Sequence, residues 1–345
     1  MKISRRPWGT ADGEPVWLFD IEGEGIRAGI SNYGGVIQSL EVNGPQGRRA
    51  DVVLGYDTLD EYRRSDTFFG AMIGPIADRL AGGRCVLDGR EVRLPLNAGP
   101  DSMHCADLGF HRAVWDWRAL EDGLCLSRTF ADAPGGFPGA LSVELRCRIV
   151  APRALRLEYE ARCTRETAVS VTNHSYFNLS GARADCRDHL LRVCAGRYAQ
   201  TTCAADPICT GRTLPVEGTP LDFRCGRTVG GAVDRLDFAE IVSAGGVDHY
   251  FLAEGEGMRE VARLCCPGTG LQLRCLSDAP GLLVYTGNGL EGERGKGGAV
   301  YGKNWGVCLE TARFPNAVNL PEWRPQVLLK PGERYTAATE FVFDW

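Results

Sequence analysis

Short stretches in which apolar and polar residues alternate constrain the fold of this chain more than any other feature of its sequence. Residues 143–149 alternate apolar side chains with charged ones, and the same period returns over residues 155–163 after a turn that contains Pro152. Successive side chains of a β-strand point to opposite faces, so this pattern predicts an antiparallel hairpin with one buried and one solvated face. Residues 271–275 repeat the pattern.

Turn signals between these stretches favour many short strands over long helices. The 345 residues include 44 glycines and 18 prolines without a collagen-like period, and Asp88-Gly89 between two apolar runs predicts a hairpin. A capping box at Thr58 to Glu61 predicts one or two turns of helix. Long segments with a 3.6-residue period are absent. We therefore expect an all-β fold of packed antiparallel sheets with few short helices, in a single domain over residues 1–345.

Charge and cysteine content exclude several classes of protein. The formal net charge of −5 gives no basic surface for nucleic acid or for an anionic membrane. Residues 1–7 are followed by no apolar stretch typical of a secretion signal, and no run is long enough to span a bilayer. The 14 cysteines include no Cys-x-x-Cys pair, which disfavours structural zinc. We expect reduced, mostly buried thiols in a cytoplasmic protein.

A few polar residues stand in surroundings that favour chemistry. His174 lies in the segment TNHSYFNL at residues 172–179, where a strand-like stretch becomes polar and aromatic together. His104 follows a polar loop, Glu310 lies in an apolar strand-like stretch shortly before Phe314, and Asp248 follows Gly245-Gly246. Each residue alone is equally compatible with a structural role or a surface ion pair.

Together these segments resemble the aldose 1-epimerase (galactose mutarotase) family. The TNHSYFNL segment is the most specific motif, and LGYD at 54–57, YTGN at 285–288 and Glu310-Thr311 follow the family order. The resemblance covers the chain from about residue 25 to its C-terminus. It implies the large antiparallel sandwich known as the galactose mutarotase-like supersandwich. It also implies an isomerase without metal or organic cofactor that acts on a free monosaccharide as a monomer or homodimer.

The resemblance also implies roles for particular residues. Mutarotation removes a proton from the C1 hydroxyl of the sugar and delivers one to the ring oxygen, for which a carboxylate and an imidazole are suited. Glu310 would be the general base and His174 the general acid, with His104 stabilising the developing charge. In substrate binding, the resemblance implies that Arg79 and Asp248 hold hydroxyl groups, with Asp78 and Leu283 beside them. The ring of Phe314 would cover a C–H face of the sugar.

The sequence departs from the family pattern around the expected sugar site. Asp78 stands where the family commonly has Asn, Leu283 replaces a Gln that contacts the sugar, and Cys105-Ala106 replaces Gly-Gly. The substrate is therefore less well specified than the reaction. Two alternatives stay open from the sequence. One is a catalytically inert carbohydrate-binding protein of the same fold, and the other is a glycoside hydrolase that uses Glu310 and Asp248 as its two carboxyl groups.

Overall fold

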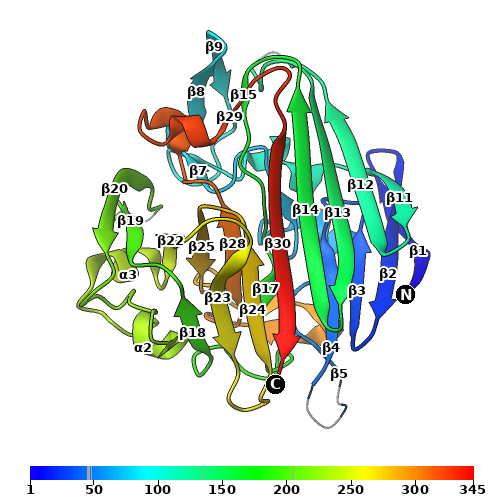
Figure 1. Ribbon diagram of the computed structural model, residues 1–345, viewed down its shortest axis with the longest axis vertical. Coiled ribbons are helices and arrows are strands. Elements are labelled where there is room, and N and C mark those ends of the chain that lie inside the picture. The colour runs from blue at the N-terminus through cyan, green and yellow to red at the C-terminus, as the bar shows by residue number, and fades with distance from the viewer. Residues whose placement is uncertain (45–46, 48, 134, 205) are drawn as a thin grey trace.

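The alternating stretches of the sequence form strands in the computed structural model, which describes residues 1–44, 47, 49–133, 135–204 and 206–345 (Figure 1). Strand β13 (Leu141–Ala151) pairs with β14 (Ala154–Cys163) in an antiparallel hairpin. Val143, Leu145 and Cys147 are buried while the charged residues between them face outward. The hairpin predicted from the alternation is confirmed.

These two strands belong to a nine-stranded sheet in which the neighbouring strands are antiparallel. Its C-terminal strand lies at the centre, because β30 inserts between β14 and β24. In spatial order the sheet consists of β11 (Asp116–Leu120), β12 (Gly123–Phe130), β13, β14, β30 (Tyr335–Asp344), β24 (Gln272–Ser277), β23 (Arg259–Cys265), β18 (Leu190–Val193) and β21 (Arg227–Thr228).

Two further sheets pack against the nine-stranded one. The six-stranded sheet runs in the order β17 (Tyr176–Phe177), β28 (Val307–Ala312), β25 (Gly281–Tyr285), β22 (Asp248–Leu252), β19 (Arg197–Thr201) and β20 (Cys209–Pro215). The five-stranded sheet is a meander of β1 (Lys2–Ala11), β2 (Glu14–Gly23), β3 (Ile26–Ser31), β4 (Ile37–Asn43) and β5 (Arg49–Asp51).

Five two-stranded ladders complete the strands of the described residues. Two of them, β6 with β16 and β7 with β10, carry polar residues toward the six-stranded sheet, as described below. The pairs are β6 (Met72–Ile73) with β16 (Thr172–Asn173), β7 (Arg79–Leu80) with β10 (Ser102–Met103), β8 (Arg84–Leu87) with β9 (Arg90–Arg93), β15 (Thr167–Ala168) with β29 (Leu328–Leu329), and β26 (Glu293–Arg294) with β27 (Val300–Tyr301).

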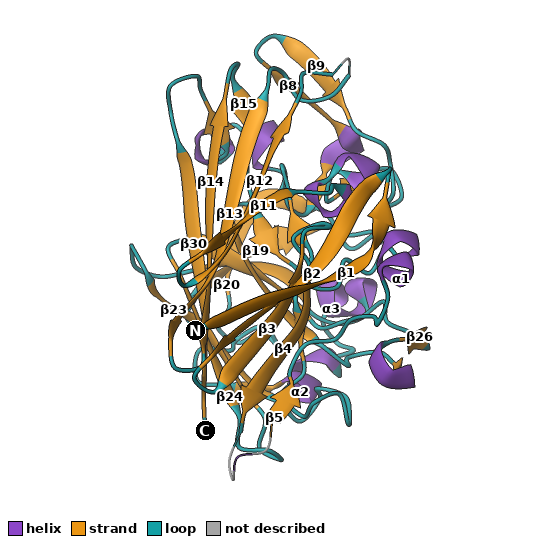
Figure 2. Ribbon diagram, turned by 90° about the vertical axis from the view of Figure 1, so that its right-hand side faces the viewer, coloured by secondary structure: helices purple, strands orange, loops and turns teal. Residues whose placement is uncertain are grey.

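Buried side chains of the three large sheets meet in one hydrophobic cluster. Leu157 comes from the nine-stranded sheet, Phe177 and Leu282 from the six-stranded sheet, and Ile30 and Leu40 from the five-stranded sheet. Figure 2 shows β13, β14 and β30 on one side of this interior and β2, β3 and β4 on the other. Removing this apolar surface from water holds the layers together. The expected all-β, antiparallel sandwich is confirmed.

Helices are few and short, as the sequence predicts. Within the described residues the α-helices are α1 (Leu59–Arg64), α2 (Val229–Val233) and α3 (Ala239–Ala244). The side chain of Thr58 accepts a hydrogen bond from the backbone N–H of Glu61, whose carboxylate accepts one from the N–H of Thr58 in return, so the capping box is confirmed. Among these described helices, none has the length and apolar character required to cross a membrane.

The Asp88-Gly89 hairpin and the burial of the cysteines also agree with expectation. Asp88 and Gly89 adopt positive φ angles of 48° and 70° in the turn between β8 and β9, which is the conformation of a tight two-residue hairpin loop. All fourteen cysteines are free thiols, and ten of them are buried: residues 85, 105, 125, 147, 163, 186, 209, 266, 275 and 308.

Candidate active site

One face of the six-stranded sheet gathers polar side chains from three neighbouring strands. Leu283 of β25 lies opposite Glu310 of β28, and Tyr285 lies between Cys308 of β28 and Asp248 of β22. Side chains two residues apart on a strand share a face, so these five project from the same face. The residues between them on these strands face the hydrophobic core. The pairing register therefore determines which side chains meet.

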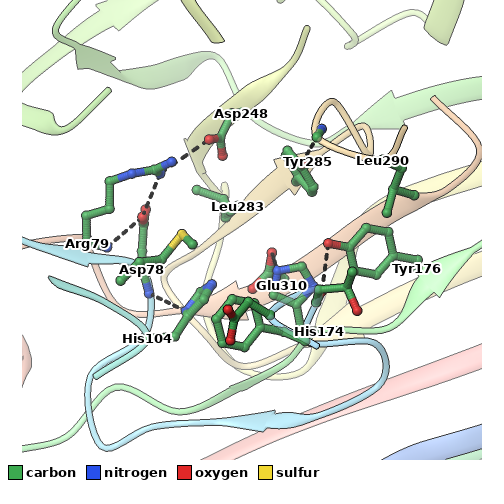
Figure 3. A pocket seen from close by; sticks show the side chains of 15 residues that line it. Asp78, Arg79, His104, His174, Tyr176, Asp248, Leu283, Tyr285, Leu290 and Glu310 are labelled. Atoms are coloured by element: carbon green, nitrogen blue, oxygen red, sulfur yellow. Dashed lines mark hydrogen bonds and ion pairs between the residues drawn. The ribbon is translucent and has the colours of Figure 1, made fainter. Parts of the chain in front are cut away.

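Loops from the two-stranded ladders close over this face. Arg79 begins β7, Asp78 precedes it, His104 follows β10, and His174 lies between β16 and β17. Together with the sheet they enclose a cavity of about 180 Å³ (Figure 3), a space suited to one small polar molecule. The cavity is lined by Asp66, Thr67, Phe68, Asp78, Arg79, Met103, His104, His174, Tyr176, Asp248, Leu283, Tyr285, Gly289, Leu290 and Glu310.

Most site residues named from the sequence line this cavity. They come from distant parts of the chain: Asp78, Arg79, His104, His174, Asp248, Leu283 and Glu310. Phe314 requires a correction, because its ring is stacked on Trp323 with 4.0 Å between centroids and packs beside Tyr250 in a separate hydrophobic cluster. With only 2% of its surface exposed, Phe314 is a core residue and does not offer its face to a molecule in the cavity.

His174 and Glu310 form a pair of titratable groups on the cavity floor. Nε2 of His174 lies 3.5 Å from Oε1 of Glu310, and both side chains are buried. Oε1 has no hydrogen-bond partner of good geometry among the described residues. A buried carboxyl oxygen without a partner is costly, so this atom is placed to receive a hydrogen bond or a proton from a bound molecule.

Burial moves the proton affinities of the pair in opposite directions. It lowers the pKa of His174 to about 4, against a smaller opposing effect of a hydrogen bond to the residue's own backbone. Burial also raises the pKa of Glu310 well above its ordinary value, helped by the charges of Asp78 and Asp248 and opposed by Arg79. The carboxylate is thus a stronger base, and the imidazolium a stronger acid, than in water. Over a wide pH range the pair therefore holds one proton, which resides on Glu310 rather than on His174.

A chain of charges lies at the opposite end of the cavity. Nη1 of Arg79 lies 3.3 Å from Oδ2 of Asp248 and 3.4 Å from Oδ1 of Asp78, and its Nε has no hydrogen-bond partner in the described part of the chain. Burial raises the pKa of Asp78 to about 6, with Arg79 opposing and Asp248 adding to the shift. This end of the cavity offers both donors and acceptors, which is the requirement for recognising hydroxyl groups.

His104 is held as a neutral hydrogen-bond donor. Its Nδ1 accepts the backbone N–H of Asp78 at 3.1 Å, so the other ring nitrogen carries the proton of the neutral ring. Burial, followed by the nearby positive charges of protonated His174 and His111 and of Arg79, lowers the pKa of His104 well below its usual value. An imidazole fixed in this way can donate to a bound oxygen without first taking up a proton.

The backbone after His104 makes one departure from the family pattern energetically unfavourable. His104, Cys105 and Ala106 have φ angles of 55°, 63° and 47°, a left-handed region in which glycine is unstrained and other residues are disfavoured. Gly-Gly after the histidine would suit this turn better than Cys105-Ala106. Such strain concentrates at functional sites because the surrounding structure must enforce it.

A second buried histidine–carboxylate pair lies behind Asp248. Nδ1 of His249 accepts the backbone N–H of Asp248 at 3.1 Å, and Nε2 of His249 lies 3.5 Å from Glu240. Glu240 in turn accepts hydrogen bonds from Tyr198 and Thr201. The histidine of the Asp248-His249 motif therefore faces away from the cavity and helps to position the aspartate that faces it.

Sequence reasoning missed the aromatic walls of the cavity. The ring of His174 stacks on Tyr176 at 4.9 Å and on Phe68 at 5.9 Å between centroids, and Tyr285 lies edge-on at 6.2 Å. Tyr176 and Tyr285 stand in the recognised motifs and could have been found there by their strand phase. Phe68 has a φ of 58° in a loop, and no sequence pattern marks it.

The donor set of the cavity floor also bears on metal binding. One ligand atom from each of His104, His174 and Glu310 lies within 4.8 Å of the others, so their spacing alone would permit a cation. His174 and Glu310 already contact one another, and the backbone of Asp78 orients His104. This arrangement serves proton transfer to an organic molecule equally well. The sequence-based expectation of a metal-independent site stays a prediction.

The chain is similar to known proteins over nearly its whole length. The profile of the Aldose 1-epimerase family matches residues 18–342. Galactose mutarotase of Sus scrofa is 39% identical over 331 residues, which are 95% of this chain and 94% of that protein. Aldose 1-epimerase of Escherichia coli (strain K12) is 30% identical, with 99% of each chain covered. The crystal structure of galactose 1-epimerase from Lactobacillus acidophilus has the same fold, with a TM-score of 0.85 at 24% identity, covering 99% of this chain and 98% of that one.

The charge chain makes a prediction about pH. In an Asp248→Asn variant the pKa of Asp78 should fall below its wild-type value of about 6, because a negative charge that disfavours ionisation is removed and Arg79 is left to Asp78 alone. Carboxyl ¹³C shifts followed through a pH titration measure this pKa. Asp107→Asn, at a side chain that is 84% exposed, is the control and should change nothing at Asp78. An Asp78 titration that is the same in Asp248→Asn and wild type would contradict the coupling.

Proposed function

The chain belongs to the aldose 1-epimerase family and is a mutarotase acting on a free monosaccharide, and we propose that His174 and Glu310 transfer the two protons of its reaction. The observation that carries this assignment is their position: Nε2 and Oε1 lie 3.5 Å apart on the cavity floor, and burial raises the pKa of the carboxyl and lowers the pKa of the imidazole.

Ring opening requires one proton to leave the sugar and one to enter it. The pair reacts in the form in which its one proton has moved from Glu310 to Nε2 of His174 across the 3.5 Å contact, a minor form whose carboxylate is a strong base and whose imidazolium is a strong acid. The Glu310 carboxylate takes the proton of the C1 hydroxyl while the C1–O5 bond breaks, and the electrons of the O–H bond form the carbonyl at C1. Protonated His174 gives its Nε2 proton to O5, which becomes a hydroxyl. A strong base and a strong acid speed both transfers. The pair begins and ends with one proton in total, so no water is consumed.

Closing the ring on the other face of the carbonyl completes the exchange of anomers. The C1–C2 bond of the open aldehyde rotates, O5 attacks C1, and the two proton transfers run in reverse from Glu310 and to His174. His104 donates a hydrogen bond to the oxygen on which negative charge develops. Because its ring is neutral and fixed by Asp78, this donor needs no reorganisation during the reaction.

The other end of the cavity binds the substrate in this proposal. Arg79 and Asp248 hold hydroxyl groups at fixed positions, with Asp78 beside them as an additional acceptor when ionised. The aromatic rings of Phe68, Tyr176 and Tyr285 supply the apolar surfaces for C–H faces that the sequence analysis assigned to Phe314.

This arrangement disfavours the two alternatives left open by the sequence. An inert binding protein has no need of an imidazole beside a carboxyl group on the cavity floor, where Oε1 of Glu310 has no hydrogen-bond partner among the described residues. In a glycoside hydrolase, Asp248 would have to act as the second catalytic carboxyl group, but it is paired with Arg79 at 3.3 Å, which suits holding a hydroxyl. Nitrophenyl glycosides should therefore release no nitrophenol.

The remaining parts of the proposal concern the setting of the enzyme. We place it in the cytoplasm as a single-domain monomer or homodimer. The buried free thiols support a reducing compartment, and the hydrophobic cluster shared by the three sheets supports one folding unit.

Removal of either proton-transfer group should abolish most of the activity. Glu310→Gln and His174→Asn keep similar shapes, and each should lower kcat for mutarotation by a factor on the order of 10² to 10⁴. Polarimetry of a freshly dissolved α-anomer, with the uncatalysed rate subtracted, measures the loss. Glu340→Gln, a carboxyl change in β30 outside the cavity, is the matched control. Wild-type rates in either of the first two variants would refute the assigned roles.

Leu283 should weaken the binding of sugars that need a polar partner at its position. The family pattern has Gln there, which both donates and accepts hydrogen bonds, whereas the leucine side chain lines the cavity beside Glu310 and does neither. A buried hydroxyl left unpaired costs about 1–3 kcal/mol, or roughly a ten- to hundredfold loss of affinity. We expect aldoses that lack or reorient this hydroxyl, such as pentoses and deoxysugars, to be preferred over galactose.

The measurement is kcat/KM across galactose, glucose, xylose, arabinose and fucose for wild type and Leu283→Gln. The variant should gain on galactose and lose its preference for the smaller sugars. Leu283→Met is the control that keeps an apolar side chain of similar volume. If galactose is already the best substrate and Leu283→Gln gains nothing on it, then Leu283 does not face a sugar hydroxyl.

A further inference from the structure

Strand β28 contacts both nitrogens of one imidazole. Glu310 approaches Nε2 of His174 at 3.5 Å, and Sγ of Cys308, two residues earlier on the same face of the strand, lies 3.5 Å from Nδ1. The thiol is fully buried, and its neighbour across the ladder is Tyr176, whose ring stacks on His174. The sulfur is thus fixed at the nitrogen that the proposed proton transfer does not use.

The chemistry of proton transfer through Nε2 requires a proton on Nδ1 throughout the cycle. When His174 gives its Nε2 proton to the sugar, the neutral ring that remains must carry its hydrogen on Nδ1. The same tautomer is needed when Nε2 recovers a proton. In the other tautomer Nε2 is already protonated while neutral and cannot accept one. Which nitrogen carries the hydrogen is set by the hydrogen bond that the opposite nitrogen makes.

We propose that Cys308 is a positioning residue that accepts a hydrogen bond from Nδ1–H of His174 and so keeps Nε2 as the proton-transferring nitrogen. This inference rests on the proposed role of His174. It gives one of the fourteen cysteines, which the sequence identifies only as buried apolar residues, a part in the reaction.

A thiol has the properties that this position needs. Burial raises the pKa of Cys308 well above its ordinary value, and Glu310 and Asp248 add to the shift, so the sulfur stays protonated and uncharged. A neutral sulfur is a weak acceptor. It can hold the tautomer without stabilising the imidazolium, and it therefore leaves His174 a strong acid. A carboxylate at Nδ1 would instead stabilise the imidazolium and make His174 a weaker acid.

Other groups around His174 do not take the place of the thiol. Those that face it or lie close by are Glu310 from β28, His104 after β10, His111 beyond Phe68, Tyr176 from β17, Tyr285 from β25, and Asp78, Arg79 and Asp248 at the far end of the cavity. Within the described residues, Cys308 and Glu310 are the side chains in polar contact with the ring nitrogens. A hydrogen bond to the His174 backbone acts on the ring as well, and it favours the charged form.

Substitution of Cys308 separates this role from packing. In Cys308→Ala the acceptor is lost, and we expect kcat for mutarotation to fall about three- to tenfold, the effect of one hydrogen bond, with KM unchanged. Cys308→Ser restores an uncharged acceptor and should recover most of the rate. The ring ¹⁵N shifts of His174 should indicate the Nδ1–H tautomer in wild type and Cys308→Ser, and a mixture of tautomers in Cys308→Ala. Cys275→Ala removes an equally buried thiol from the nine-stranded sheet and should leave kcat and the His174 shifts unchanged.

Two outcomes would overturn the inference. Wild-type kcat and ¹⁵N shifts in Cys308→Ala would show that the thiol does not set the tautomer. A Cys308→Ser variant that folds and behaves like Cys308→Ala would show that only packing is lost. His174→Asn distinguishes failure of this inference from failure of the proposed function. If His174 is the acid and Cys308 is irrelevant, His174→Asn is inactive. If His174→Asn is active, the function assigned to His174 is wrong.

Discussion

The pairing register of β28 with its neighbours is the constraint on which the site depends. Side chains of a strand alternate between faces, so the register that sends Leu309 into the core also presents Glu310 to the cavity and Cys308 to the ring of His174. A shift of one residue would exchange the two faces, bury the carboxylate in the hydrophobic interior and expose apolar side chains to the substrate. The stability of the sandwich and the composition of the site are therefore consequences of the same pairing.

Burial sets the pKa values of His174 and Glu310 once the register has placed them. Withdrawal from water raises the proton affinity of Glu310 and lowers that of His174. A strong base beside a strong acid suits the proposed reaction, in which the sugar loses a proton at one oxygen and gains one at another oxygen nearby. The charges of Asp78, Arg79 and Asp248 are kept at the other end of the cavity, where they compensate one another. The proposed mechanism therefore places the recognition of hydroxyl groups and the transfer of protons at different ends of one cavity.

The sequence predicts the sheets well because period-two patterning is a local signal. The β13–β14 hairpin, the Asp88-Gly89 turn and the capped helix α1 could all be predicted from short stretches. Motif resemblance supplied most of the site, since Arg79, His174 and Glu310 stand in recognisable segments. Contacts between distant segments were not accessible in this way.

Those distant contacts account for what was wrong or missed. Phe314 follows Glu310 closely in sequence, yet it lies beyond the end of β28, where the chain leaves the sheet and its ring stacks on Trp323. Phe68 lines the cavity only because a loop with a positive φ turns its ring toward three histidines. Cys308 looks like any other buried cysteine until the pairing of Tyr176 with Cys308 brings His174, two residues before Tyr176, within 3.5 Å of its sulfur.

The pH dependence of kcat/KM for mutarotation tests the central claim, that one proton shared by His174 and Glu310 drives the reaction, most directly. Measured between about pH 3 and about pH 10 with the uncatalysed rate subtracted, it reports the groups of the free enzyme. The account predicts a bell whose acid limb falls near pH 4, from His174, and whose alkaline limb lies well above the ordinary range of a glutamate, from Glu310. A flat profile, or an acid limb near the ordinary histidine value of about 6.5, would contradict it.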